Sequence, residues 1–216
     1  MNASSASLHN NIPVRTGGVP LEQAKSGVIL LHGRGATAED ILSLAPELNL
    51  NKTIFLAPQA AQYTWYPQRF SAPLENNEPW LSSALQVIER LLQQLNNAGI
   101  PAESTILLGF SQGACLALEY AARHPRRYGG IAGLSGALIG PPGIERIPSG
   151  DLEQTPVFIG CSDVDPHIPL ERVEYSARFY ERLQARISVR IYPGMGHQVN
   201  MDEIQAVREM THALDS

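Results

Sequence analysis

At positions 105–118 the chain reads Thr-Ile-Leu-Leu-Gly-Phe-Ser-Gln-Gly-Ala-Cys-Leu-Ala-Leu. A short apolar run of this kind is typical of a buried strand, and the Ala- and Leu-rich segment over 113–124 is typical of a helix. Between them stands the pattern Gly-x-Ser-x-Gly, in which Gly109 and Gly113 permit a tight turn. Such a turn holds the hydroxyl of Ser111 up at the edge of a sheet. The stretch therefore predicts a strand, a sharp turn with a presented serine, and a helix.

The same alternation of strand and helix patterns continues along the chain. Further strands are predicted at 28–32, 53–56, 130–134, 156–160 and 187–192. Further helices are predicted from the N-cap Thr37, over 79–99 and 170–185, and from Asn200 onward. This alternation favours an α/β fold whose mostly parallel sheet has helices on both faces. We expect a single domain over 1–216, with an edge hairpin near 13–19 and a loose tail over 1–12.

Composition excludes several classes of protein. The chain has 216 residues, 44% of them hydrophobic, and a formal net charge of −5, so we expect no nucleic-acid partner. The apolar runs are too short to cross a bilayer and the N-terminal residues do not resemble a secretory signal. Two cysteines, Cys115 and Cys161, do not make a disulfide framework. A soluble, cytoplasmic protein without an integral membrane segment is the expectation.

Ser111 needs a base to take its proton, and the base needs an acid to orient it. Our candidate base is His197, which follows the last predicted strand in Pro-Gly-Met-Gly-His. The candidate acid is Asp165, because the proline after it fixes the turn, whereas Asp163 suits a supporting role. The chain order Ser, Asp, His is the order expected of an α/β-hydrolase. Less suitable histidines lie in the tail, at a helix end and on the terminal helix: His9, His124 and His212.

A serine nucleophile also needs donors for the oxyanion that develops on the substrate. We predict that the backbone N–H groups of Gln112 and Arg34 form this oxyanion hole. The side chain of Arg34 either contacts substrate at the rim or is simply solvated. Residues predicted to contact substrate are His32, Gly33, Trp65, Tyr66 and Phe70. The alternative for His32 is a buried, hydrogen-bonded histidine, and for the aromatic residues it is plain packing.

At this point the chain resembles the phospholipase/carboxylesterase family of α/β-hydrolases, which is related to the acyl-protein thioesterases. The matching motifs run from about residue 27 to the end: Leu-His-Gly-Arg-Gly-Ala at 31–36, Ala-Pro-Gln at 57–59, Gly-Phe-Ser-Gln-Gly-Ala at 109–114, Asp-Pro-His-Ile-Pro at 165–169 and Gly-Met-Gly-His at 194–197. The resemblance implies a hydrolase without a large cap domain that cleaves small carboxylic esters or thioesters of short to medium acyl chains. It also implies that the protein is sometimes a homodimer. One departure is Arg34, where the eukaryotic thioesterases carry an apolar residue, so long-chain acyl-protein and lysophospholipid substrates are the less favoured alternative.

The sequence thus predicts a serine esterase that needs no metal and no organic cofactor. Three other interpretations compete with it. Residues 33–38 also match a dinucleotide-binding fingerprint, but no acidic residue follows the second strand to hold a ribose. The alternating side chains of Cys161, Asp163, Asp165 and His167 form a mixed ligand set that suits zinc poorly. A ligand-binding protein that has lost catalysis is the third interpretation, although all the candidate residues of a catalytic triad are present.

Overall fold

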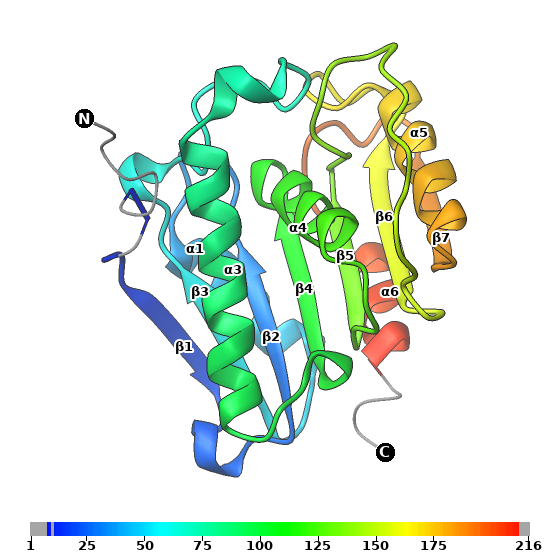
Figure 1. Ribbon diagram of the computed structural model, residues 1–216. Helices are drawn as coiled ribbons and strands as arrows, with labels where there is room; N and C mark the ends of the chain where they lie inside the picture. The colour runs from blue at the N-terminus through cyan, green and yellow to red at the C-terminus, as the bar shows by residue number, and fades with distance from the viewer. Residues whose placement is uncertain (1–7, 10, 212–216) are drawn as a thin grey trace, which may run out of the picture.

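The computed structural model describes residues 8, 9 and 11–211, which build one seven-stranded sheet (Figure 1). The strand order is β1-β3-β2-β4-β5-β6-β7, and only β1 runs antiparallel to its neighbour. The strands are β1 (Val14–Gly18), β2 (Ser26–Leu31), β3 (Thr53–Pro58), β4 (Thr105–Phe110), β5 (Gly130–Leu134), β6 (Pro156–Ser162) and β7 (Arg186–Tyr192). The predicted α/β class with a mostly parallel sheet is confirmed.

Helices cover both faces of the sheet. On one face lie α3 (Trp80–Asn97), α4 (Gln112–Arg123) and α5 (Leu170–Arg182), and on the other α1 (Ala38–Leu42), α2 (Ala45–Leu48) and α6 (Met201–Thr211). Short 3₁₀ turns occur at Leu21–Gln23, Ala61–Tyr63, Leu74–Asn77 and Ala102–Ser104. Successive residues of a strand pack into the hydrophobic cores on opposite faces of the sheet, because side chains alternate across it. Ile106 and Leu107 of β4 do so.

Two helices begin with a side-chain cap at the residue that the sequence predicts. The Thr37 hydroxyl accepts from the Asp40 amide while the Asp40 carboxylate accepts from the Thr37 amide, which makes a capping box. Asn200 and Glu203 form the same reciprocal pair at the start of α6. Both caps lie just beyond the carboxyl end of a strand or its loop, so they fix the paths of two loops that border the site.

Two predictions about the first residues are wrong where the structure describes them. Residues 14–18 form a single edge strand paired with β3, and no hairpin, since Gly18 serves a close approach in which a Cβ would lie 2.1 Å from the Thr53 carbonyl oxygen. Residues 1–7 and 10 of the predicted tail lie outside the described residues. His9 is fully buried, and its ring lies against Trp65 and Trp80.

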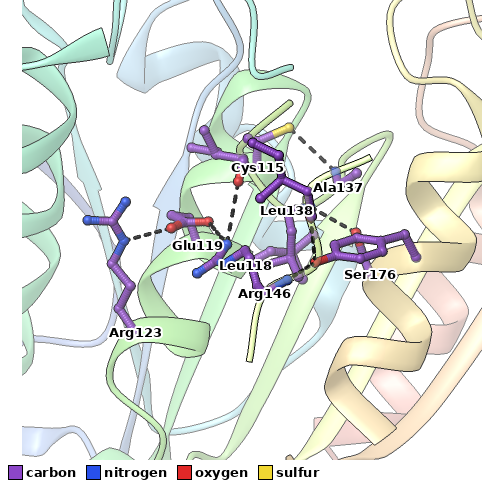
Figure 2. A network of polar contacts seen from close by, with 12 residues as sticks. Cys115, Leu118, Glu119, Arg123, Ala137, Leu138, Arg146 and Ser176 are labelled. Carbon is purple, nitrogen blue, oxygen red and sulfur yellow. Dashed lines mark hydrogen bonds and ion pairs between the residues drawn. The ribbon is translucent and has the colours of Figure 1, made fainter. Parts of the chain in front are cut away.

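A buried polar network joins α4 to the turn-rich loop over 140–150. Figure 2 shows Glu119 between Arg123 and Arg146, with 2.6 Å from each guanidinium to a carboxylate oxygen. The Glu119 side chain is fully buried, so its charge depends on these two partners. The contact fixes the loop against the helix that follows Ser111.

Replacing Arg146 should therefore destabilise the fold. We expect Arg146→Met to lower the free energy of unfolding by about 1–3 kcal/mol, because Glu119 keeps one cation where it had two. The matched control is Arg182→Met, which removes a surface pair with Glu145 from the same region and should cost less than about 0.5 kcal/mol. Urea denaturation of both variants measures the difference, and equal losses would contradict the role given to the buried pair.

No helix among residues 8, 9 and 11–211 is both long enough and apolar enough to pass through a membrane.

Candidate active site

Ser111 stands on a sharp turn between β4 and α4. Its backbone has φ 54° and ψ −118°, in the left-handed half of the map, and its amide donates to the Leu134 carbonyl of β5. The flanking glycines are required by contact: a Cβ on Gly113 would lie 2.0 Å from the Leu31 carbonyl oxygen, and one on Gly109 would lie 2.3 Å from the backbone of Gly113. The sequence pattern therefore forms the predicted strained turn, which holds the hydroxyl above the sheet edge.

The structure brings together three side chains from different loops at this edge. His197 Nε2 lies 2.8 Å from Ser111 Oγ, and His197 Nδ1 lies 2.7 Å from Asp165 Oδ2. Asp165 follows β6 and His197 follows β7, so the parallel register delivers both to the carboxyl edge that Ser111 occupies. A hydroxyl, an imidazole and a carboxylate in this sequence of contacts can pass a proton from the hydroxyl to the ring.

The surroundings of Asp165 favour the ionised form of its carboxylate. Its burial opposes the charged form, but contacts from His197 and from the amides of His167 and Ile168 outweigh burial and keep its pKa below the ordinary value. Both amides donate to Oδ1, at 2.8 and 3.0 Å, which leaves Oδ2 for the imidazole. The carboxylate is therefore ionised at neutral pH and fixed in orientation.

The loop that carries His197 is attached to the loop that carries Asp165. The Gly194 amide donates to Asp163 Oδ1 at 2.8 Å, and the Gly196 amide donates to Ser162 Oγ at 3.0 Å. Asp163 thus has the supporting role proposed for it from the sequence. Ser162 carried no sequence signal, because a serine at a strand end has no pattern that announces a partner 34 residues away.

Two further rings confine the imidazole of His197. Phe110 lies 5.0 Å from it and His167 lies 4.7 Å from it, measured between ring centroids. His167 approaches edge-on at an interplanar angle of 75°. The sequence offered His167 as a less suitable base, only two residues beyond the candidate acid, and as a member of the mixed ligand set, but not as a neighbour of the His197 ring.

A pocket of about 490 Å³ opens beside Ser111. It is lined by Gly33, Arg34, Ala36, Tyr66, Pro67, Gln68, Arg69, Phe70, Phe110, Ser111, Gln112, Cys115, His167, Ile168 and His197. Within the described part of the chain, the backbone N–H groups of Arg34 and Gln112 donate to no other residue. Both residues line the pocket together with Ser111, where donors to an oxyanion are needed.

The predicted substrate contacts divide into two groups. Gly33, Tyr66 and Phe70 line the pocket, as that role requires. His32 and Trp65 do not: both are fully buried, and the Trp65 indole N–H donates to the His32 carbonyl oxygen. The prediction is wrong for these two residues because their rings turn into the core.

The ring of His32 has partners on both nitrogens. Nδ1 lies 2.7 Å from the Gly33 carbonyl oxygen and Nε2 accepts from the Ala60 amide. Burial lowers its pKa, the opposing bond to Gly33 notwithstanding, so the ring stays neutral. The alternative of a buried, hydrogen-bonded histidine describes it.

The cysteines lie in the core. Burial raises the pKa of both Cys115 and Cys161 to about 12, which keeps the free thiols protonated at neutral pH. Among residues 8, 9 and 11–211, no group of three or more His, Cys, Asp or Glu side chains is placed to hold a metal ion.

Glu203, in the first turn of α6, is buried, and among the residues that the structure describes its carboxylate oxygen Oε1 has no hydrogen-bond partner. Burial raises its pKa to about 7, against the lowering effect of the Asn200 amide. A carboxyl whose pKa is raised by folding binds its proton more tightly in the folded state. Its contribution to stability is therefore complete below about pH 4.5 and is lost as the pH rises through about 7.

We expect Glu203→Gln to remove this loss. Glutamine keeps the capping box and carries no charge, so the variant should gain stability over the native chain between pH 5 and 8, by on the order of a few kcal/mol. Thermal unfolding at several pH values measures the gap between the two proteins. A gap independent of pH would show that Glu203 does not titrate in this range.

Comparison with known proteins decides the family. The phospholipase/carboxylesterase family model matches residues 19–214. The chain belongs to this family. It is therefore a carboxylic ester hydrolase with the α/β-hydrolase fold.

Three similar proteins illustrate the match. A phospholipase/carboxylesterase structure from Dyadobacter fermentans superposes with a TM-score of 0.88 at 44% identity, covering 94% of this hydrolase and 98% of the other chain. Esterase PE8 superposes with a TM-score of 0.79 at 26% identity, covering 94% and 99%. An acyl-protein thioesterase 1 from Saccharomyces cerevisiae is 29% identical over 211 residues, which span 86% of this hydrolase and 91% of the relative.

Proposed function

We propose that this hydrolase is a serine esterase in which Ser111 is the nucleophile, His197 the general base and acid, and Asp165 the orienting carboxylate. The proposal is carried by one observation, the continuous hydrogen-bonded chain from Ser111 through His197 to Asp165 at the mouth of a pocket. The ionised state of Asp165 supports it, because a carboxylate holds the Nδ1 proton of the ring and leaves Nε2 free to accept.

The reaction follows from these positions. The Ser111 hydroxyl gives its proton to Nε2 of His197 as the oxygen attacks the acyl carbonyl. The carbonyl oxygen becomes an oxyanion that the amides of Arg34 and Gln112 receive. His197 then protonates the leaving alcohol or thiol, and water activated by the same ring hydrolyses the acyl-enzyme. Asp165 stays ionised throughout and stabilises the imidazolium.

For the substrate we propose carboxylic esters of short to medium acyl chains. The pocket volume of about 490 Å³ and its lining by Tyr66, Phe70 and Ile168 suit an acyl group of modest length. The acyl-protein thioesterases among the relatives favour thioesters as a second candidate class. The homodimer and the cytoplasmic location stay predictions.

A fluorophosphonate probe tests the nucleophile directly. We expect one covalent adduct per chain, on the peptide that contains Ser111, since the probe reacts only with an activated serine hydroxyl. A matched series of p-nitrophenyl esters and acyl thioesters then defines the substrate class. An adduct on another serine would refute the assignment.

A further inference from the structure

The guanidinium of Arg34 donates hydrogen bonds to three successive backbone carbonyls. Nη2 donates to the carbonyl oxygens of Tyr66, at 2.8 Å, and Gln68, at 2.6 Å, while Nη1 donates to that of Pro67, at 3.0 Å. A planar guanidinium presents several donors in fixed directions, so one side chain can satisfy all three acceptors together. Arg34 is exposed and lines the pocket, as the two alternatives from the sequence expect, but its guanidinium is also hydrogen-bonded to the protein, which neither alternative includes.

Gln112 holds the same segment from the buried side. Its Oε1 accepts from the Trp65 amide at 2.9 Å, and its Nε2 donates to the Tyr66 carbonyl oxygen at 2.8 Å. The Tyr66 carbonyl is therefore shared between Gln112 and Arg34. The two residues whose amides are proposed as oxyanion donors therefore both bond to residues 65–68 through their side chains.

This segment is one wall of the pocket. Residues 66–70 line it continuously, and they lie in no helix or strand that could fix their position through its own backbone bonds. Tyr66 and Phe70 are nearly buried and form part of the apolar lining, while Pro67 and Gln68 are exposed. The position of the wall consequently depends on side chains that reach it from outside, and Arg34 supplies three of those bonds.

We propose that Arg34 is a positioning residue that sets the acyl-chain selectivity of this hydrolase by fixing the wall over 66–68. The inference rests on the proposed function, in which the acyl group occupies this pocket. With the guanidinium in place the wall stands close to Ser111 and favours short acyl chains. Without it, the converging carbonyls lose their common donor and the wall moves outward, so that longer chains gain room.

The test compares kcat/KM for p-nitrophenyl butyrate and octanoate in Arg34→Leu and the native protein. We expect the octanoate-to-butyrate ratio to rise about tenfold, which is the smallest factor expected if just one of the four additional methylenes of octanoate gains a place in the apolar pocket. The change should appear mainly as a lower KM for octanoate with a smaller change in kcat, since the backbone N–H at position 34 remains. Arg34→Lys should give an intermediate ratio, because an ammonium group cannot meet three carbonyls in one plane.

The matched control is Arg69→Leu. Arg69 lies in the wall segment and lines the same pocket, but within the described residues its guanidinium makes no hydrogen bond or ion pair. Its removal takes away the same charge without removing the bonds that Arg34 makes to the wall, so the octanoate-to-butyrate ratio should rise clearly less than in Arg34→Leu. A rise in Arg69→Leu equal to that in Arg34→Leu would overturn the proposal, because charge at the rim would then explain both.

Two further readouts separate the possible failures. The melting temperature of Arg34→Leu reports folding, and Arg34→Lys preserves the test if the leucine variant is unstable. An unchanged ratio in folded Arg34 variants, in a protein whose activity depends on Ser111, would overturn the inference and leave the proposed function intact. Activity independent of Ser111 would instead overturn the proposed function itself.

Discussion

Ser111→Ala is expected to abolish ester hydrolysis while leaving the fold unchanged. Alanine keeps the backbone of the turn but removes the oxygen that attacks the acyl carbon, so His197 has no proton to accept. We expect kcat to fall by at least about 10⁴-fold, since a hydrolase of this kind without its nucleophile retains only what substrate binding and the oxyanion donors contribute. Initial rates on p-nitrophenyl butyrate measure the loss.

The matched control for this experiment is Ser135→Ala. Ser135 also follows a strand, has φ 50°, and carries a buried hydroxyl without a partner, but it does not line the pocket. Its removal should leave the rate within about twofold of the native value, as expected of a change outside the site. Full activity in Ser111→Ala, with no adduct from a fluorophosphonate, would place the nucleophile elsewhere.

Asp165→Asn carries the second largest expected effect. The amide oxygen of asparagine can still accept from the His167 and Ile168 amides, which leaves an amide N–H facing Nδ1 of His197. Nδ1 must then accept a hydrogen bond, so the ring proton moves to Nε2, where it blocks transfer from Ser111. We expect kcat/KM to fall by about 10³–10⁴-fold at neutral pH.

Asp163→Asn is the control for Asp165→Asn. It replaces a neighbouring carboxylate whose one hydrogen bond within the described residues comes from the Gly194 amide, a bond that an asparagine oxygen also makes. A loss of less than about tenfold is expected, because the imidazole keeps its tautomer. The rates of both variants should be compared from pH 6 to pH 9, and losses of similar size would contradict the distinct role given to Asp165.

The sequence predicts the sheet and the three side chains of the proposed triad because each depends on a local pattern. Ser111, Asp165 and His197 each follow an apolar run of strand length, and parallel strands place their carboxyl ends at one edge. The glycines beside Ser111 are also readable, since only a residue without a side chain fits that turn. The positions of the strand ends and the order of the three residues along the chain were sufficient to select them, without knowledge of any long-range contact.

The loop over 57–78 could not be predicted in the same way. It has no periodicity, so nothing in its residues distinguishes a ring that turns into the core, as Trp65 does, from one that faces the pocket, as Tyr66 does. Nor does an arginine in a glycine-rich loop reveal that its acceptors are carbonyls more than 30 residues away. Such partners follow from the packed loop and are visible only once it is folded.

The buried position of His9 bears on how this protein is prepared. Its ring nitrogens bond to the Trp65 carbonyl and the Ala61 amide, so it fills a socket directly behind the loop that walls the pocket. A shortened protein that begins after residue 9 would have a cavity beside the indole rings of Trp65 and Trp80. The Ala61 amide would also lose the acceptor that His9 provides. Removing the residues up to His9 to aid crystallisation would thus weaken the packing behind the loop that lines the pocket. A loss of activity caused in this way could be mistaken for a defect in catalysis.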